Sequence, residues 1–409
     1  MTLDADWVVT MAGPPIRCGR VVIESGRIAA VGAADDVPLR GEHRPLGESV
    51  LLPGLINAHC HLELSAYHGA LAARDLWSWL EGLVRLRLQA NAAAREQAAV
   101  PGAVRSMVRS GTTCVGDICR AAWLPEVLSH RLIRKVCYVE LISGAMFPPA
   151  DVEQLQQRLE ALPSDDRLLV KAISPHSPYT VTPQDLRACG DLAMRGALPL
   201  AIHLAETPEE VEWLRHGTGR IQRWHARLLR NPPRPPRTGP TRYVLDAGLW
   251  RAPAAALIHM NYADDWLDLF TLPADRRPVV VYCPRSHAFF GHQPHPFRQM
   301  LNAGLTVAVG TDSAASQPPG QNRPASVLDE LRWLHARHPD IPAKTLLEMG
   351  TIHAAAALGL SGRIGSLTAG RQADLVAFPM MAPGVADPLE TVLAGSQDPS
   401  VVCLAGEIL

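Results

Sequence analysis

The feature that most constrains the fold is a series of short apolar runs that alternate with longer helical stretches after Pro53-Gly54. The stretches between the runs include 76–89, 98–110, 183–195, 208–215 and 325–335, and their length and periodicity favour helices. The candidate strands contain or precede the runs at 55–57, 113–117, 135–139, 168–172, 198–202, 256–258, 279–282 and 306–309. Eight strand–helix units in succession predict an α/β fold, a parallel (β/α)8 TIM barrel.

The two ends of the chain have β character of another kind. Short β-type runs at 7–10, 20–23 and 27–31 are separated by Gly and Pro, and Glu24-Ser25-Gly26-Arg27 predicts a tight hairpin in an antiparallel unit. Two further apolar runs, at 373–378 and 401–406, follow the predicted barrel. We therefore expect residues 1–53 and 363–409 to form one small β-sandwich-like domain, and residues 54–362 to form the barrel.

Proline-rich residues 231–240 cannot form a helix or a central strand, because proline lacks the backbone donor. We expect this run to be a surface loop within a long strand-to-strand connection. It does not divide the barrel into two domains.

Charge composition bears on the partner. The 39 Lys and Arg residues almost balance the 40 Asp and Glu residues, so there is no overall field that would attract nucleic acid or an anionic membrane. No apolar run is long enough to span a bilayer, and the N-terminus has no signal-peptide pattern. We expect a cytoplasmic enzyme with a small-molecule substrate; whether it forms a homodimer stays open.

Three short motifs carry candidate metal ligands. In Asn57-Ala58-His59-Cys60-His61, two histidines two residues apart on an extended strand point to the same side and can reach one metal ion. His203 ends another apolar run, with Glu206 three residues later. Asp312 follows the last run. Zinc and similar metals accept this mixture of imidazole and carboxylate ligands.

Each motif also has an ordinary structural interpretation. His203 could be a hydrogen-bonded histidine at a strand end, Glu206 a solvated acid at a helix start, and Asp312 the N-cap of the next segment. The three motifs, however, follow the first, fifth and eighth predicted strands. Barrel enzymes assemble their active sites at the C-terminal ends of the strands. Together the motifs therefore predict a catalytic metal site at the barrel mouth.

The chain resembles the amidohydrolase superfamily, specifically its aminohydrolase branch of nucleobase and nucleoside deaminases and triazine chlorohydrolases. The resemblance extends over essentially the whole chain. It rests on residues 52–61 (LPGLINAHCH), 111–117 (GTTCVGD), 174–180 (SPHSPYT), 203–207 (HLAET), 283–287 (CPRSH), 310–313 (GTDS) and 365–376 (GSLTAGRQADLV). The last of these segments is similar to the family's return to its β domain.

The resemblance implies a role for each candidate residue. Glu206 would move a proton to a ring nitrogen, His259 would polarise the attacking water, and His176 would contact the substrate. Asp312 would also take the proton of the water. Zinc is the first expectation for the one divalent metal ion, with iron and manganese as alternatives. The metal ligands implied are His59, His61, His203 and Asp312.

Two further residues, His287 and Lys171, bear on the expected metal site. Ser286-His287 departs from the Ser-Asn that is frequent in the family, so the role of His287 stays open. Some amidohydrolases use a carboxylated strand-four lysine to bridge two metal ions. Lys171 lies five residues before His176 and inside an apolar run, too deep or on the wrong face for that task. We therefore expect a mononuclear site.

A shorter likeness bears on the substrate. Residues 59–65 (HCHLELS), 77–80 (WSWL) and 85–87 (RLR) resemble the aminodeoxyfutalosine deaminases of the alternative menaquinone pathway. Glu63 would then bind ribose hydroxyls or a ring nitrogen, or else orient a metal-bound histidine. Trp79 would line the pocket over a purine, or else pack in the core.

The function that these expectations favour is release of ammonia from an amino-substituted heterocycle. A 6-aminopurine nucleoside of the aminodeoxyfutalosine, adenosine or S-adenosylhomocysteine type is the expected substrate. The alternatives are a chlorohydrolase or cyclic-amide hydrolase that uses the same metal-activated water, and a barrel scaffold without catalysis. Glu206 favours deamination, because a chloride leaving group needs no proton.

Overall fold

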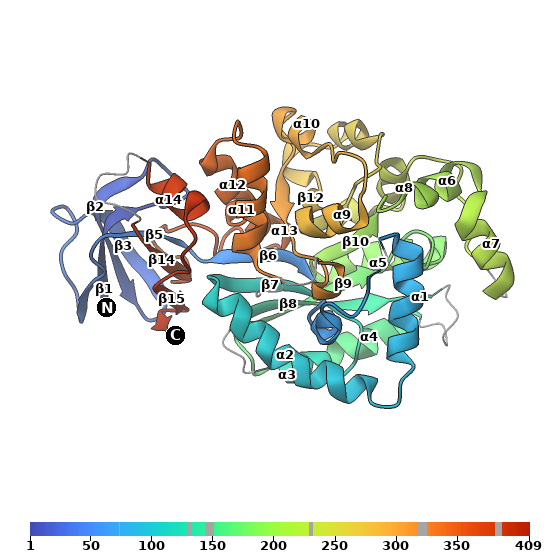
Figure 1. Cartoon of the computed structure of the whole chain (residues 1–409), viewed down its shortest axis with the longest axis horizontal. Helices are drawn as coiled ribbons and strands as arrows, with labels where there is room; N and C mark the ends of the chain where they lie inside the picture. The colour runs from blue at the N-terminus through green and yellow to red at the C-terminus, as the bar shows by residue number, and fades with distance from the viewer. Residues whose placement is uncertain (73, 130–132, 144–150, 229–231, 318–324, 381–386) are drawn as a thin grey trace.

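Two β-sheets organise the part of the chain that the computed structural model describes, residues 1–72, 74–129, 133–143, 151–228, 232–317, 325–380 and 387–409. Each sheet contains eight strands, and the two share none. Figure 1 shows the sheet formed by the chain ends at one end of the molecule's long axis, with both termini close to it, and the second sheet with most of the helices at the other.

The larger body is a parallel barrel. Its sheet runs in the order β13-β12-β11-β10-β9-β8-β7-β6, so each strand pairs with its neighbours in sequence. All these pairs are parallel. The strands are β6 (Leu55–Cys60), β7 (Thr112–Cys119), β8 (Arg134–Leu141), β9 (Leu169–Pro175), β10 (Leu200–Leu204), β11 (Ala255–His259), β12 (Val279–Tyr282) and β13 (Val307–Val309). The predicted (β/α)8 barrel is confirmed.

Closure of the barrel depends on the segment after β13. The backbone N–H groups of Thr311 and Asp312 donate to the carbonyl of His59 at 2.9 and 3.1 Å, and Cys60 forms a parallel bridge with Asp312. Gly310 lies so close to β6 that a Cβ atom there would meet the His59 backbone at 2.9 Å. A residue without a side chain is therefore required where the two ends of the sheet meet.

Helices follow the barrel strands, and Figure 1 shows α2, α4 and α11 outside the sheet. The α-helices are α1 (Leu76–Arg87), α2 (Ala92–Arg109), α3 (Leu124–Leu128), α4 (Val152–Glu160), α5 (Pro183–Gly196), α6 (Pro208–His216), α7 (Gly219–Leu228), α8 (Pro240–Asp246), α9 (Pro284–Phe290), α10 (Phe297–Asn302), α11 (Val327–Arg337), α12 (Ala343–Met349), α13 (Ile352–Ala357) and α14 (Pro388–Ala394). The 3-10 turns are η1 (Leu62–Tyr67), η2 (Leu249–Arg251), η3 (Trp266–Thr271), η4 (Ala274–Arg276) and η5 (Ala314–Ser316).

Burial explains why the barrel strands read as nearly continuous apolar runs. Every residue of β7 and β8 is buried, because one face of each strand meets the barrel interior and the other meets the helices. The interior is filled by small and branched side chains, and the alanine-rich helix α13 packs into the same cluster. Tyr138 of β8 donates its hydroxyl to the carbonyl of Ala357 at the end of α13.

The terminal segments form the second sheet, in the order β16-β15-β14-β5-β1-β2-β3, with β4 paired to β1. Its strands are β1 (Thr2–Val8), β2 (Ile16–Glu24), β3 (Arg27–Ala33), β4 (His43–Pro45), β5 (Ser49–Pro53), β14 (Leu375–Pro379), β15 (Val401–Leu404) and β16 (Glu407–Ile408). The N- and C-terminal segments therefore share one sheet, as the sequence predicts. The exact division of the chain at residues 53/54 and 362/363 stays a prediction.

The N-terminal unit differs from the expected antiparallel arrangement in one respect. The hairpin between β2 and β3 is present, and Ser25 and Gly26 take the positive φ angles, 48° and 75°, of a tight two-residue turn. However, β1 pairs in parallel with both β4 and β5, so the sheet is mixed. The chain crosses back to β1 through the connection after β3, and because β3 already runs in the direction of β1, the strands β4 and β5 join β1 in parallel.

The proline-rich run behaves as expected where it is described. Residues 232–239 have no helix or strand and lie between α7 and α8 in the connection from β10 to β11. Asn231 lies outside the described residues. Pro240 begins α8, a helix position where the missing N–H costs no hydrogen bond.

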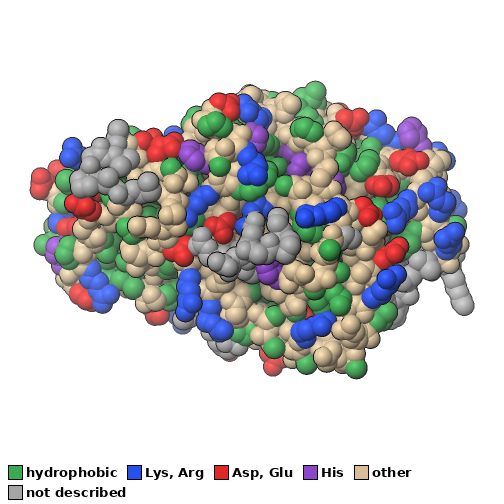
Figure 2. Space-filling view, in the orientation of Figure 1, with side chains coloured by type: hydrophobic (Ala, Val, Ile, Leu, Met, Phe, Trp, Pro, Cys, Tyr) green, Lys and Arg blue, Asp and Glu red, His purple; other side chains and the backbone are tan. Residues whose placement is uncertain are grey.

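Two global features concern partners. In the described part of the chain, no helix is both long enough and apolar enough to cross a membrane. On the face shown in Figure 2, basic and acidic side chains are interspersed.

Candidate metal centre

The four predicted metal ligands meet at one end of the barrel. His59 lies in β6, His61 follows β6, His203 lies in β10 and Asp312 follows β13. Nε2 of His59 and Nε2 of His61 each lie 3.6 Å from Oδ1 of Asp312. Nε2 of His203 lies 3.3 Å from Nε2 of His61. The fold thus brings together side chains that are up to 253 positions apart in the sequence, from Asp312 back to His59.

The donor atoms of this cluster fit a divalent metal ion. Nε2 of His59 is buried and has no hydrogen-bond partner among the described residues, an arrangement that costs about 1–3 kcal/mol unless something fills the gap. Nδ1 of His203 donates to the carbonyl of His176 at 2.9 Å, which leaves its Nε2 lone pair facing the cluster. Burial lowers the pKa of His61 and His203 well below its usual value, so both rings stay neutral, as metal ligands must be.

Asp312 is held by two hydroxyl groups. Ser286 Oγ donates to Asp312 Oδ2 at 2.5 Å, and Ser316 Oγ donates to the same oxygen at 3.0 Å. These bonds turn Oδ1 toward the histidines. Burial alone would raise the pKa of Asp312, but the neighbouring histidines lower it well below the usual value. Asp312 is therefore an ionised carboxylate. Its Oδ2 is bound by the two serines, and its Oδ1 faces the histidine cluster.

Glu206 and His259 lie beside this cluster. Nε2 of His259, the last residue of β11, is 3.6 Å from Oε1 of Glu206, which follows β10. Burial, with the negative charges of Asp312 and Glu210, raises the pKa of Glu206 well above its usual value. Burial lowers the pKa of His259 to about 3. The pair thus combines a carboxyl group that can carry a proton at neutral pH with a neutral imidazole.

Backbone strain occurs at four positions around these side chains. Among the non-glycine residues with positive φ are Ala205 (50°), His259 (72°), Met260 (56°) and Asp312 (55°). All four lie at or just beyond the ends of barrel strands. A non-glycine residue in this conformation costs about 1–3 kcal/mol and persists only where surrounding contacts enforce it. The strained positions mark the barrel mouth as a functional site.

Glu210 fixes the backbone of Glu206. Its carboxylate, on the first turn of α6, accepts the N–H groups of Ala205 at 2.9 Å and Glu206 at 3.1 Å. Asn261 donates its side-chain amide to the Glu206 carbonyl at 3.0 Å. Burial raises the pKa of Glu210 to about 7. Glu210 is not among the predicted site residues, although the Thr207-x-x-Glu210 spacing is a helix-capping signal.

His176 lies next to the cluster, as expected. Its ring centroid is 5.0 Å from that of His203, and its Nδ1 contacts Thr180 Oγ1 at 2.7 Å. Burial lowers the pKa of His176 to about 4, so this ring is also neutral. Glu140, a buried residue of β8 that sequence analysis did not single out, has a carboxylate oxygen within 4.8 Å of donor nitrogens of His176 and His203.

Glu63 and Trp79 make other contacts. Glu63 is 1% exposed, forms an ion pair with Arg87 and accepts the N–H of Ala121 at 3.3 Å. Trp79 packs against Phe290 and donates its indole N–H to the carbonyl of Ala315 at 3.1 Å. The structure therefore places Trp79 in an apolar cluster and Glu63 in a buried charge network. Their predicted contact with substrate stays a prediction.

Lys171 and His287 do not belong to the clusters of converging donor atoms in the described part of the chain. In β9, Ala172 belongs to the barrel interior, whereas Leu169 and Ile173 pack outward. Since side chains alternate along a strand, Lys171 shares the outward face, and the expected single-ion site stays a prediction. His287 Nε2 donates to the carbonyl of Gln293 at 2.8 Å.

Two further polar residues hold the loops of the site in place. Asn57 donates to Thr311 Oγ1 at 2.8 Å and accepts the N–H of Thr311 at 3.1 Å, so it ties β6 to the loop that carries Asp312. Asp117, at the end of β7, accepts the N–H of Leu62 at 2.8 Å, and burial raises its pKa to about 8. Asn57 lies in the same sequence motif as His59 and His61, and Asp117 ends the apolar run at 113–117.

Comparisons with known proteins find relatives over most of the chain. The profile described as the amidohydrolase family matches residues 50–409. The chain is 31% identical to the 5-methylthioadenosine/S-adenosylhomocysteine deaminase of Syntrophobacter fumaroxidans, over 94% of its own length and 83% of that protein.

Solved structures show the same fold. The aminofutalosine deaminase of Helicobacter pylori in complex with methylthio-coformycin is 22% identical with a TM-score of 0.86, covering 100% of this chain and 99% of that one. An adenosine deaminase from Xanthomonas campestris with bound zinc is 24% identical with a TM-score of 0.82, covering 100% and 92%. At these identities the likeness establishes the fold.

Proposed function

The chain belongs to the amidohydrolase family, and we propose that this hydrolase of carbon–nitrogen bonds is a metal-dependent deaminase of adenine nucleosides. The observation that carries the proposal is the Glu206–His259 pair, 3.6 Å apart beside three imidazoles and a carboxylate. Removal of an exocyclic amine requires proton transfer to the ring and to the leaving group. A protonated glutamate beside the cluster meets that requirement.

The donor set supports one divalent ion, for which zinc is our proposal. The ligands would be His59, His61, His203 and Asp312. When bound, such an ion lowers the pKa of a coordinated water from 15.7 to about 7 and so supplies a nucleophile at neutral pH.

The protein's own groups then handle the protons. Asp312, whose Oδ2 is held by Ser286 and Ser316, accepts a proton from the attacking water. Glu206 donates its proton to a ring nitrogen, so that negative charge does not build up on the purine as C6 becomes tetrahedral. His259, neutral at ordinary pH, contributes a hydrogen bond to the oxygen that attacks C6. Asp312 then passes its proton to the amine, which leaves as ammonia, and the hydroxyl group on C6 returns a proton to Glu206 and becomes the 6-oxo group.

The substrate class follows from the relatives. A protein named for 5-methylthioadenosine and S-adenosylhomocysteine shares 31% identity over 94% of the chain. We therefore propose an adenosine derivative with a 5′-thioether substituent as substrate. Aminodeoxyfutalosine, which would place the enzyme in the alternative menaquinone pathway, is the competing 6-aminopurine nucleoside.

The test is ammonia release by zinc-loaded protein from 5′-methylthioadenosine, S-adenosylhomocysteine, aminodeoxyfutalosine, adenosine and guanine. Glu206→Gln removes the proton donor with little change in shape, and we expect kcat to fall about 10²- to 10⁴-fold. Glu209→Gln, a change to a partly exposed neighbour, is the matched control and should leave kcat unchanged. Zinc content measured on each variant shows whether the centre survives.

Two outcomes would reject the proposal. Protein with zinc bound that releases ammonia from none of the nucleosides is not an adenine-nucleoside deaminase. Release of chloride from a chlorinated triazine under the same conditions would instead assign the alternative leaving group. A cytoplasmic location and a homodimer stay predictions that fractionation and sedimentation can address.

A further inference from the structure

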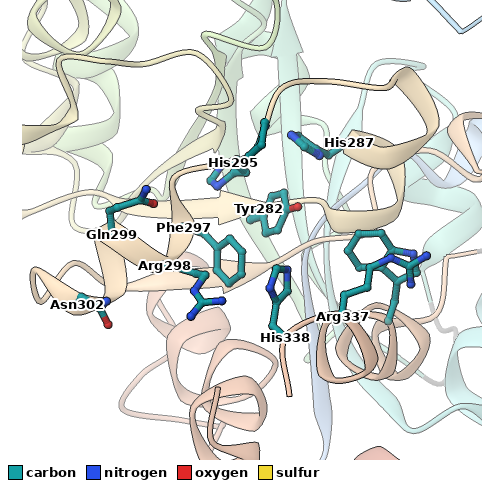
Figure 3. A pocket seen from close by; sticks show the side chains of 11 residues that line it. Tyr282, His287, His295, Phe297, Arg298, Gln299, Asn302, Arg337 and His338 are labelled. Carbon is teal, nitrogen blue, oxygen red and sulfur yellow. The ribbon is translucent and has the colours of Figure 1, made fainter. Parts of the chain in front are cut away.

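A cavity of about 530 Å³ lies between the end of β12 and helices α10 and α11 (Figure 3). Its walls include Tyr282 of β12, Phe297 and Arg298 of α10, Trp333 and Arg337 of α11, and His295 from the segment before α10. This volume is within the range of small-molecule sites in proteins, about 300–1,000 Å³.

The cavity is separate from the metal centre. Along β12, Val279 and Val281 belong to the apolar cluster inside the barrel, whereas Val280 and Tyr282 pack with the surrounding helices. Side chains of a strand alternate between its two faces, so Tyr282 points away from the barrel interior. The strand itself therefore stands between the cavity and the side chains that converge inside the mouth.

The inner wall of the cavity is a stack of flat rings. The centroid of Tyr282 lies 4.1 Å from that of His295 and 5.1 Å from that of Phe297, with interplanar angles of 24° and 21°. Figure 3 shows Tyr282 between His295 and Phe297, with its hydroxyl oxygen turned away from Phe297. Such surfaces favour a planar, aromatic occupant.

The rim carries positive charge. Arg298 is paired with Asp340, but Arg337 has no carboxylate partner among the described residues and instead stacks 3.9 Å above the ring of Trp333. The described residues that line the cavity include arginines and histidines and no Asp or Glu. An exposed guanidinium that is already oriented by an aromatic ring is suited to a carboxylate, sulfonate or phosphate group.

We propose that this cavity is a second small-molecule site, which takes a flat aromatic ring bearing one anionic group. The ring would lie between Phe297, the outer ring of this stack, and Trp333, and the anion would bind Arg337. The proposal concerns a different surface from that of the deaminase centre and does not depend on the reaction assigned there.

One hydrogen bond connects the two sites. His295 Nε2 donates to the carbonyl of His259 at 2.7 Å, and His259 holds a strained backbone at φ 72° beside Glu206. Nδ1 of His295 is buried without a hydrogen-bond partner among the described residues, so this nitrogen can accept a hydrogen bond from an occupant of the cavity. An occupant that displaces the His295 ring loosens the contact that supports His259, and we expect kcat to fall.

The probe for binding is 8-anilino-1-naphthalenesulfonate, an aromatic anion whose fluorescence rises in apolar surroundings. It is titrated into the zinc-loaded wild-type protein, Arg337→Gln and Arg105→Gln. Both arginines are exposed, so neither change disturbs the core, and Arg105 lies on α2. We expect binding to the wild type and to Arg105→Gln, and about tenfold weaker binding to Arg337→Gln, because a charge-assisted hydrogen bond is lost. Equal affinity in all three proteins, or no binding, would overturn the proposal.

A kinetic arm separates this site from the nucleoside site. With 5′-methylthioadenosine as substrate, the probe should lower kcat of the wild type without raising KM, and the effect should weaken in Arg337→Gln. Competitive inhibition that is equal in both proteins would place the probe in the nucleoside site and overturn the proposal. If no nucleoside is deaminated, the titration alone still decides whether the cavity binds the anion.

Discussion

At the scale of single residues, the candidate centre depends on side chains that hold its ligands in one orientation. Asp312 has its Oδ2 bound to two serines, and His203 has its Nδ1 bound to a carbonyl. Each of these bonds occupies the atom of the ligand that faces away from the cluster. The remaining atoms are thereby oriented toward one point before any ion binds, which lowers the cost of organising the site.

Ser286→Ala tests this arrangement. Loss of the 2.5 Å bond leaves Asp312 Oδ2 with the Ser316 hydroxyl, and the carboxylate gains freedom to rotate. We expect zinc affinity to fall about 10- to 100-fold, measured by competition with a chelator of known affinity. Ser366→Ala, at a buried serine that bonds Thr368, is the control. Unchanged affinity in Ser286→Ala would show that this serine does not orient the ligand.

At the scale of secondary-structure elements, the ends of the strands determine where chemistry can occur. β10, β11 and β13 each lead into a residue with left-handed backbone, at Ala205, His259 and Asp312. This conformation turns the chain sharply at the barrel mouth, so that side chains after the strand face the centre. Helix α6 begins directly after such a turn, with Thr207 as its N-cap.

Glu210→Gln tests the contribution of α6. The glutamate accepts two backbone N–H groups with its two oxygens, whereas glutamine has only one oxygen and leaves one N–H unpaired. We expect kcat to fall about tenfold at full zinc occupancy, as the Glu206 peptide loses its fixed position. Measurement of kcat beside Glu209→Gln is the check, and an unaltered kcat would exclude a positioning role.

The small sheet supplies a pH-dependent test. Asp4 of β1 forms a two-oxygen contact with Arg20 of β2, at 2.7 and 2.8 Å, and also accepts from His43 of β4 at 2.9 Å. The hydrogen bond from Arg20 lowers the pKa of Asp4 below its ordinary value of 3.8. The carboxylate is therefore favoured in the folded state. Its stabilisation is present above pH 4 and is lost as pH falls through the lowered pKa.

Asp4→Asn should accordingly cost about 1 kcal/mol of unfolding free energy at pH 7, a modest value because the pair is partly exposed. Urea unfolding followed by circular dichroism should give the same difference from wild type at pH 5.5, and a smaller one below about pH 4. Asp6→Asn, an exposed position on the same strand, is the control. A difference that grows as pH falls would contradict this account.

At the scale of the whole molecule, a buried ion pair joins the barrel to the terminal sheet. Arg134, the first residue of β8, contacts both oxygens of Asp374 at 2.8 and 3.0 Å. Asp374 also accepts the N–H of Ala405, and each charged side chain of the pair is 2% exposed. Because neither charge reaches water, each depends on the other and on its hydrogen bonds.

Asp374→Asn leaves the Arg134 guanidinium buried without its counter-charge. We expect a loss of about 3–5 kcal/mol in unfolding free energy by urea denaturation. Asp36→Asn, at an exposed position of the terminal segment, should change it by less than about 0.5 kcal/mol. A loss under 1 kcal/mol for Asp374→Asn would mean that the barrel and the terminal sheet are held together mainly by apolar packing.

Sequence alone determined the features that repeat or stand next to each other in the chain. Apolar runs with turn residues between them predicted the strands, because a strand buried on both faces must be apolar throughout. The His59-x-His61 spacing and the positions of His203 and Asp312 after strands predicted a common site, because parallel strands of a barrel end on the same side. The tight turn at Ser25-Gly26 was likewise readable from local residues.

Tertiary structure alone decided how distant segments contact one another. The parallel pairing of β1 with β5 depends on a crossover, which leaves no local pattern. Glu63 and Trp79 face an arginine and an apolar cluster, because the positions of α1 and η1 on the barrel select their neighbours. The anchoring of Asp312 by Ser286 and the cavity beside Tyr282 arise from helices packed against the sheet. Non-local packing depends on shape and on many weak contacts, and a single sequence does not specify these position by position.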